Sequence, residues 1–144
     1  MAKAWHTYNF TKYNFIMSFS DYSEEKILNW LGNNASMPAT GNRYIGLFSD
    51  NPGEANTGTE ETTNIRPSGR VQATFATAAN GQISNSAIID FGNSFAQVTI
   101  THFAIFDAAS AGNLIAYGAL TNQKQIDVSD EISFPIGTLV ITLD

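Results

Sequence analysis

Two apolar runs, Val98–Phe106 and Leu114–Leu120, constrain the fold more than any other feature of this chain. In the first run, apolar and polar residues alternate as far as His102, where the alternation shifts by one residue. A period of two is typical of a strand with one buried face, and a β-bulge corrects such a shift. The linker Asp107–Asn113 is rich in turn-forming residues, and Gly112-Asn113 can adopt positive φ. The sequence therefore predicts a long antiparallel hairpin with a bulge near His102.

Six further segments have the composition of short strands, and turn-forming residues separate them. Asn80-Gly81 lies between two of them, and this dipeptide is the strongest short signal of a hairpin. Pro135 cannot donate to a strand ladder, so it indicates an edge or a strand end. The predicted fold class is mainly β: an antiparallel β-sandwich or jelly-roll-like domain with one short N-terminal helix and an extended N-terminal arm. The six segments are Arg43–Phe48, Val71–Ala76, Gln82–Ile89, Gln125–Val128, Glu131–Phe134 and Leu139–Leu143.

Residues 20–32 have the clearest helical pattern. Ser20 or Asp21 can cap the first turn, and Asp21 with Glu24 resembles a capping box. Gly32 suits the position that follows the last turn. The apolar residues share one face and predict packing across the sheet, although this face also suits a helix that docks into a partner's groove. These residues are Ile27, Leu28 and Leu31, with Trp30 beside them.

The first 17 residues stand out by their density of aromatic side chains. Tyr-Asn-Phe occurs at 8–10 and again at 13–15, and the two aromatic residues of each copy project to one side of an extended chain. We predict a partner-binding arm over residues 1–17, attached to a single domain over residues 18–144, because aromatic residues are enriched at interfaces. The alternatives are a first strand on the chain's own domain and an extension upstream of a second start at Met17. The predicted partner-binding residues are Trp5, Tyr8, Phe10, Tyr13 and Phe15.

The chain is poor in charge and acidic overall. Charged residues make up 14% of the sequence, whereas about 25% is usual for a soluble protein. We expect subunit contacts to cover part of so weakly charged a surface, in an oligomer or a larger assembly. The net charge of −6 disfavours binding to nucleic-acid phosphates, which requires clustered cations. No apolar run reaches the length of a signal peptide core or a membrane span, so the sequence predicts a soluble, non-secreted protein.

The segment Ser49–Ser68 is long and polar for a connection inside a compact domain. Its hard oxygen ligands, on Asp50, Asn51 and Glu54, are of the type that binds calcium, but their spacing does not follow the pattern of a calcium loop. We therefore expect no metal site and interpret the segment as a solvated or subunit-contacting loop. Arg66 and Arg70 follow it and can pair with its acids at the surface.

Candidates for catalysis are few. The chain has no cysteine, which excludes thiol catalysis and thiolate metal sites. The histidines, His6 and His102, lie far apart, and a triad of His102 with Asp107 and Ser110 lacks the strand-turn-helix context of a nucleophile elbow. We expect His102 to be a buried strand residue that is hydrogen-bonded to backbone. The sequence predicts no catalytic residue and no cofactor.

Four segments, taken in order, resemble small virion proteins of tailed bacteriophages. They are SDYSEEKILNWLGN at 20–33, RYIGLFSDNP at 43–52, THFAIFDAASAGNLIAYGAL at 101–120 and SFPIGTLVITLD at 133–144. Members of this group are labelled tail fibre proteins, and similar small β domains serve as capsid decoration or cement proteins. The resemblance covers residues 18–144 and contains no catalytic motif, so it transfers no site residue.

The resemblance implies a non-enzymatic virion subunit, which we expect to form a homotrimer. We favour the capsid exterior, where a cement subunit would use its aromatic arm to bridge and stabilise major capsid proteins. The alternatives are a tail-fibre or tail-tip subunit that contacts the host, and a carbohydrate-binding module with an exposed aromatic platform. Nucleic acid and membrane are not expected as partners.

Overall fold

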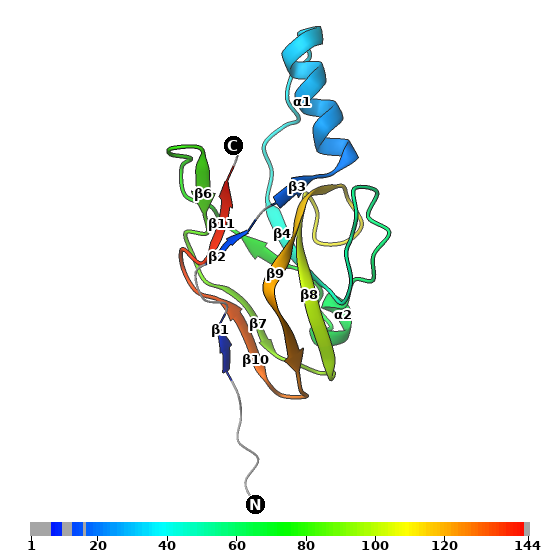
Figure 1. Cartoon of the computed structure of the whole chain (residues 1–144), viewed down its shortest axis with the longest axis vertical. Coiled ribbons are helices and arrows are strands. Elements are labelled where there is room, and N and C mark those ends of the chain that lie inside the picture. Colours follow the sequence, from blue (N-terminus) through cyan, green and yellow to red (C-terminus); the bar gives the residue numbers. More distant parts are fainter. Residues whose placement is uncertain (1–6, 10–12, 16, 143–144) are drawn as a thin grey trace, which may run out of the picture.

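The structure is a computed structural model of the chain, and it describes residues 7–9, 13–15 and 17–142 (Figure 1). These residues form the strands β1 (Thr7–Asn9), β2 (Tyr13–Phe15), β3 (Met17–Phe19), β4 (Arg43–Phe48), β5 (Val71–Ala73), β6 (Gln82–Ser84), β7 (Ile89–Asn93), β8 (Val98–Phe106), β9 (Leu114–Ile126), β10 (Glu131–Phe134) and β11 (Leu139–Thr142). The helices are α1 (Asp21–Asn33) and the one-turn α2 (Thr62–Ile65). The prediction of a mainly β chain with antiparallel sheets and one short N-terminal helix is confirmed.

The hairpin of β8 and β9 lies at the centre of a five-stranded sheet with the order β3-β9-β8-β4-β5. The pairing register shifts between Ile100 and His102, so the predicted bulge is present. In the turn of this hairpin, positive φ falls on Ala111 and Gly112, whereas the sequence had suggested Gly112 and Asn113. The predicted segments at 114–120 and 125–128 belong to one continuous strand, β9, which ends at Ile126.

Two three-stranded sheets, β1-β10-β7 and β2-β11-β6, complete the fold. Buried residues of the five-stranded sheet share one hydrophobic core with buried residues of β7, β10 and β11, which gives a sandwich-like packing. β1 pairs in parallel with β10, and β2 pairs in parallel with β11, each as the outer strand of its sheet. The backbone of Thr7–Asn9 and Tyr13–Phe15 thus lies on the chain's own domain, as in the alternative interpretation of the first 17 residues.

The region around Asn80-Gly81 forms the predicted hairpin, but its second strand is shorter than expected. Ala79 and Gln82 exchange two backbone hydrogen bonds across the turn. The predicted strand 82–89 divides into β6 and β7 at Asn85, whose side chain is buried and makes four hydrogen bonds to backbone groups. These bonds hold the chain in a bend, so a single straight strand is excluded here.

Helix α1 begins as predicted but does not pack as predicted. Ser20 is the N-cap and accepts a hydrogen bond from the N–H of Ser23, whereas the left-handed residue at the C-terminal end is Asn34 and not Gly32. The predicted packing across the sheet is wrong, because α1 extends away from the sheets (Figure 1). The cause lies in its first turn, where the hydroxyls of Ser20 and Ser23 bind carbonyls of β9 and direct the helix outward. Neither described helix has the length and apolar character that a membrane crossing requires.

Candidate functional site

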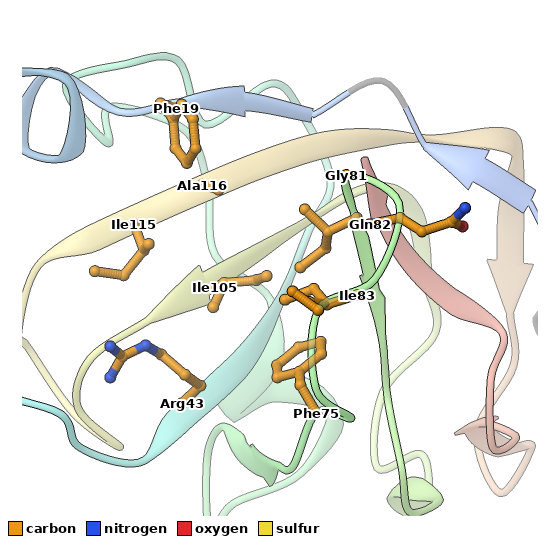
Figure 2. Close-up of a pocket in the computed structure, with 11 residues that line it drawn as sticks. Phe19, Arg43, Phe75, Gly81, Gln82, Ile83, Ile105, Ile115 and Ala116 are labelled. Atoms are coloured by element: carbon orange, nitrogen blue, oxygen red, sulfur yellow. The ribbon is translucent and has the colours of Figure 1, made fainter. Parts of the chain in front are cut away.

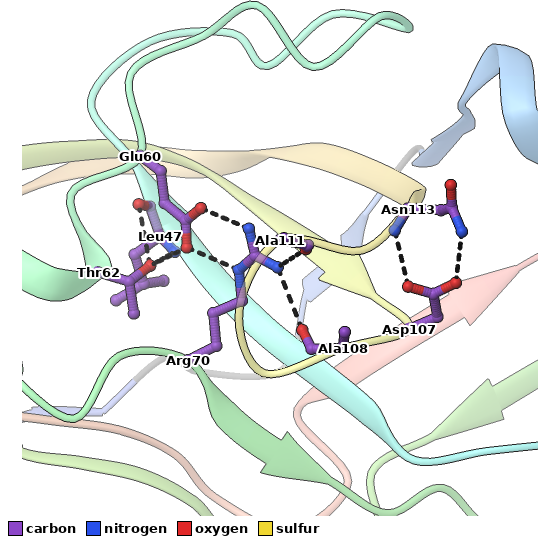
Figure 3. Close-up of polar contacts among 8 residues, drawn as sticks. All are labelled: Leu47, Glu60, Thr62, Arg70, Asp107, Ala108, Ala111 and Asn113. Atoms are coloured by element: carbon purple, nitrogen blue, oxygen red, sulfur yellow. Dashed lines mark hydrogen bonds and ion pairs between the residues drawn. The ribbon is translucent and has the colours of Figure 1, made fainter.

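Glu60 and Arg70 form an ion pair that joins distant segments of the chain (Figure 3). Arg70 donates from Nε and Nη2 to the two carboxylate oxygens of Glu60, at 2.8 and 2.7 Å. Its Nη1 donates to the carbonyl oxygens of Ala108 and Ala111, at 3.1 and 2.7 Å. The Arg70 side chain is only 8% exposed. This two-pronged geometry is the strongest form of an arginine–carboxylate contact, and it fixes the loop of residues 49–68 to the β8–β9 turn.

Neighbouring groups complete this Glu60–Arg70 cluster. The hydroxyl of Thr62 lies 2.9 Å from Glu60 Oε1 and accepts a hydrogen bond from the N–H of Leu47. The guanidinium of Arg70 lies 3.3 Å from the centre of the Phe106 ring, a cation–π contact. Gly46 leaves room for the Glu60 carboxylate and the Phe106 ring, because a Cβ at this position would lie 2.9 Å from Glu60 Oε1 and 3.1 Å from Phe106. The cluster therefore links distant segments of the same chain to one another.

The sequence predicted that Arg66 and Arg70 would pair with acids of the loop at the surface. Arg70 forms such a pair in a buried setting, whereas Arg66 donates to the carbonyl oxygens of Gly69 and Arg70. The loop also returns to the domain, since Thr62 and Ile65 of α2 are buried. The segment 49–68 is thus solvated over only part of its length, and its contact with another subunit stays a prediction.

Asp107 closes the turn between β8 and β9. Its carboxylate accepts hydrogen bonds from the backbone N–H and from the side-chain amide of Asn113, both at 2.7 Å (Figure 3). Burial raises the pKa of Asp107, but these hydrogen bonds and the nearby charge of Arg43 lower it by more, so the net pKa is below its usual value. Gly112 has a φ of +73°, and a Cβ there would lie 2.5 Å from Asp107 Oδ1. The turn therefore requires glycine at this position.

An apolar hollow of about 280 Å³ opens between the five-stranded sheet and the hairpin around Asn80-Gly81 (Figure 2). Phe19, Ile105 and Ile115 line it from the sheet, and Phe75 lines it from the hairpin segment. A second hollow, of about 430 Å³, lies beside α1 and shares Phe19 and Ile115 with the first. Ligand sites combine an apolar lining with a few convergent polar groups. The first hollow is lined mainly by apolar side chains, together with Arg43 and Gln82. Lys26, Arg43 and Asp107 also line the second hollow, so it combines apolar and charged side chains.

The residues considered for catalysis do not converge. His102 lies in β8 and Asp107 directly follows the strand, five residues or about 16 Å of extended chain away. The carboxylate of Asp107 accepts hydrogen bonds from Asn113. His102 is half-buried and its Nδ1 lies 2.8 Å from the hydroxyl of Thr101, so the expectation of a buried, backbone-bonded histidine was wrong. Burial lowers the pKa of His102, and the charge of Asp50 offsets part of this effect. His6 lies outside the described residues.

Of the residues considered for calcium, Asp50 and Asn51 bind groups within their own loop through their side-chain oxygens. Asp50 accepts from the N–H and the hydroxyl of Thr59, at 2.6 and 3.0 Å, and Asn51 accepts from the N–H of Gly53 at 2.9 Å. Across the described parts of the chain, no three His, Cys, Asp or Glu side chains are grouped as a metal site. The loop is therefore held by its own hydrogen bonds.

The structure places only part of the predicted partner-binding arm. Tyr8 lies in β1, and Tyr13 and Phe15 lie in β2. Trp5 and Phe10 lie outside the described residues. The two strands bring this segment to the outer edges of two sheets, beside β10 and β11. The use of the five aromatic side chains as a binding surface stays a prediction.

Exposed apolar side chains concentrate on α1. Leu28, Trp30 and Leu31 are 65, 55 and 72% exposed, and Met37 in the following loop is 49% exposed. The sequence showed this apolar face but suggested that the chain's own sheet covers it. Phe95 is also exposed, but it lies in the turn between β7 and β8, at the end of the molecule opposite α1 (Figure 1). Trp30 and Phe95 therefore do not form a shared platform for a sugar.

A comparison with protein families matches residues 18–142 to the family described as podophage GP4 fiber I protein gp80. A search of curated proteins found no match. The matched range includes α1, the Glu60–Arg70 cluster and the β8–β9 hairpin, and it begins after β1 and β2. Because the match covers far more than half of the chain, this protein belongs to the family of podophage GP4 fiber I protein gp80 and is a structural protein of a tailed-bacteriophage virion.

Proposed function

We propose that this chain is a non-enzymatic subunit of a virion fibre and that it assembles as a homotrimer. The observation that carries the proposal is the family match, whose description names a fiber protein and whose range includes β4 to β11. A fibre transmits force and position between the virion and the host surface, so its subunits require a fixed shape. This role requires neither a cofactor nor a reaction centre.

The internal bonding of the domain supports a role that depends on shape. Among the side chains that the structure describes, no buried nitrogen or oxygen atom lacks a hydrogen-bond partner. Asn85 and Asp130 are buried polar residues. The side chain of Asn85 accepts a hydrogen bond from the N–H of Leu139 in β11, and that of Asp130 accepts one from the N–H of Asp127 in its own turn. Buried polar groups that are fully paired make a fold rigid and specific. The geometry around His102 and Asp107 offers no converging catalytic groups, which also supports a non-enzymatic subunit.

A capsid cement subunit is the second candidate, and the first 17 residues favour it. They lie outside the family match and contain Trp5, Tyr8, Phe10, Tyr13 and Phe15. β1 and β2 are outer strands, and the free edge of an outer strand can pair with another chain. In this role the aromatic side chains would bind the major capsid protein, and several arms of one oligomer would act together.

The copy number of the chain in purified virions separates the two roles. Quantitative mass spectrometry would compare it with the major capsid protein and with a known tail protein. The fibre role predicts a copy number near that of the tail protein, in multiples of three. A copy number near that of the capsid protein would establish the cement role instead, and absence from the virion would contradict both.

Substitution of the arm tests how the subunit attaches. Replacing the five aromatic residues of the arm by serine keeps the length of the chain and should abolish attachment to virions that lack the protein, while the circular dichroism of the β domain is retained. Phe95→Ser provides the control, because Phe95 is exposed but lies outside the arm. Normal attachment of the arm variant would show that another surface anchors the subunit.

A further inference from the structure

The second hollow, of about 430 Å³, lies between the inner face of α1 and the five-stranded sheet. Tyr22, Lys26 and Trp30 line it from α1, and their spacing of four residues places them one after another along one face of the helix. Phe19 and Ile115 line it from the sheet and also line the first hollow (Figure 2). Small-molecule sites enclose roughly 300–1,000 Å³ and have a mainly apolar and aromatic lining. The second hollow therefore has the size and the lining of a ligand site.

Two cationic side chains, those of Lys26 and Arg43, line this hollow without an ion pair to any described residue. The ammonium of Lys26 lies 5.4 Å from the centre of the Tyr22 ring, and the positions three and four residues away on the helix hold no acid. Arg43 donates from Nη1 to the carbonyl oxygens of Gly41 and Asn42, at 3.0 and 3.1 Å. A guanidinium has further N–H donors. Both cations are thus available to an anion in the hollow.

Asp107 is the one acid that lines the hollow. Its two oxygens accept hydrogen bonds from Asn113, and each carboxylate oxygen can accept a second one. The lining therefore has two positive charges and one negative charge, whereas the chain as a whole has a net charge of −6. This charge pattern fits a ligand that carries both a carboxylate and hydroxyl groups.

We propose that this hollow binds an acidic sugar, which is a sugar ring with a carboxylate group, as a unit of a polysaccharide. The rings of Tyr22 and Trp30 are eight residues or about 12 Å apart along the helix. Their faces carry partial negative charge and pack on the C–H faces of sugar rings. Lys26, between them, and Arg43, from β4, bind the carboxylate, and Asp107 accepts from a hydroxyl. The site stands on these contacts and does not depend on whether the chain is a fibre or a cement subunit.

Other classes of ligand fit the hollow less well. An apolar helix of a partner would cover Lys26 and Arg43 without a counter-charge, which is strongly unfavourable. A nucleic acid would bring its phosphates close to Asp21, Glu24 and Glu25 in the first turns of α1, on a chain that is acidic overall. A neutral sugar would contact the aromatic rings but leave both cations unpaired. An acidic sugar matches the rings and the cations together.

Titration of the full chain with oligomers of galacturonic acid, followed by NMR, tests this site. The methyl ester of the same oligomer is the control ligand, because it keeps the rings and lacks the charge. The acid form should bind about tenfold or more tightly than the ester, and added salt should weaken its binding. Equal binding of the acid and the ester would overturn the role of the cations. No binding of galacturonate or glucuronate oligomers at millimolar concentration would overturn the site.

Lys26→Gln should weaken binding of the acid form about tenfold and leave binding of the ester unchanged. Lys124→Gln is the matched control, because Lys124 is also half-buried but lies on β9 and outside the hollow. This variant should bind the acid form as the wild type does. Equal losses from the two lysine variants would show a general attraction between charges and would overturn the proposal.

Trp30→Ala should weaken binding of the acid and of the ester about fivefold or more, because both forms pack on its ring. Phe95→Ala is the control, since Phe95 is an exposed aromatic residue at the opposite end of the molecule, and it should weaken neither. Unchanged binding to the Trp30 variant would contradict the proposed stacking. The copy number in virions decides the fibre role separately, so failure of the sugar site and failure of the fibre role can be told apart.

Discussion

Helix α1 leaves apolar side chains exposed, whereas the Glu60–Arg70 cluster pairs two charged side chains with each other. The cluster buries the Arg70 side chain, leaves the Glu60 side chain 26% exposed, and supplies the partners of both from its own chain. Leu28 and Leu31 of helix α1 remain in contact with water, since the described parts of the chain leave them mostly uncovered. A buried charge without a partner is strongly destabilising, so the contacts that neutralise it must form as the chain folds. An exposed apolar face is tolerated in the monomer and becomes useful when a second chain binds. The first region therefore stabilises the fold of its own chain, whereas the second leaves apolar surface uncovered.

The two regions meet at the turn between β8 and β9. Arg70 binds the carbonyl oxygens of Ala108 and Ala111 in this turn. Ser20 binds the carbonyl oxygen of Leu114, three residues further along. The cluster thus holds the turn, and the turn holds the base of α1. A rigid turn would give α1 a defined direction, which a symmetric assembly requires.

Arg70→Ala should have the largest effect on the fold. It removes the partner of Glu60 and leaves the carbonyl oxygens of Ala108 and Ala111 without their donor. We expect the free energy of unfolding to fall by about 3–5 kcal/mol, as is usual when one member of a buried pair is removed. Urea unfolding of the wild-type and variant proteins measures this change.

Arg66→Ala is the matched control for this substitution. Arg66 lies near Arg70 in sequence and donates to backbone carbonyl oxygens, without an ion pair among the described contacts. We expect a loss of about 1 kcal/mol. If the Arg70 variant lost no more than the Arg66 variant, the distinction between the cluster and the rest of the surface would fail.

Gly112→Ala should have the next largest effect, and Gly92→Ala provides a close comparison. The two glycines have φ values of +73° and +72°, but a Cβ at Gly112 would collide with Asp107 and Ala108, whereas no atom lies within 4 Å of one at Gly92. The backbone strain of about 1–2 kcal/mol is common to both variants. The collision should add about 1–3 kcal/mol at Gly112 alone. Equal losses in thermal or urea unfolding would show that the turn adapts and does not hold α1 rigidly.

Ser20→Ala should act on α1 and leave the sheets unchanged. It removes the N-cap of α1 and a hydrogen bond to Leu114. We expect a local loss of about 1 kcal/mol, which should accelerate amide exchange in α1 by about fivefold or more. The neighbouring Ser18→Ala is the control, since Ser18 is exposed on β3. Equal acceleration in α1 and in β8 would mean that the helix and the sheets open as one unit, contrary to the comparison above.

Much of the fold could be predicted because it depends on local signals. The bulge near His102 followed from a shift in alternation, and the hairpin around Asn80-Gly81 followed from a dipeptide with a known turn type. The N-cap at Ser20 followed from residue type. Each signal acts within a few residues, so the sequence contains it directly.

The arrangement of the site depends on contacts that sequence does not display. Nothing near Arg70 in the sequence shows that its guanidinium binds the turn at 108–111, some 40 residues away. The apolar face of α1 was visible, but amphipathicity shows only that a face is covered and not which chain covers it. The direction of α1 is decided by the hydroxyls of Ser20 and Ser23 at β9, and serine at a helix start has many other uses.

His102 offers the smallest test, because it lies in the central hairpin and away from the tip of α1. Its pKa is lowered by burial, although the charge of Asp50 offsets part of this effect. The unfolded chain therefore binds a proton at His102 at a higher pH than the folded chain does, and stability falls as the pH drops below about 6.5. Since His102 is only half-buried and solvent screens its charge, the loss should be roughly 0.5 kcal/mol or less.

The measurement compares urea unfolding at pH 7.5 and pH 5.5 in the wild-type protein and in His102→Gln. In this range the pKa of Asp107 stays well below the pH, so that carboxylate remains charged. His6 is present in both proteins, so its contribution cancels in the comparison. The variant should lose less stability on acidification than the wild type does. An equal loss in both would show that the proton binds elsewhere.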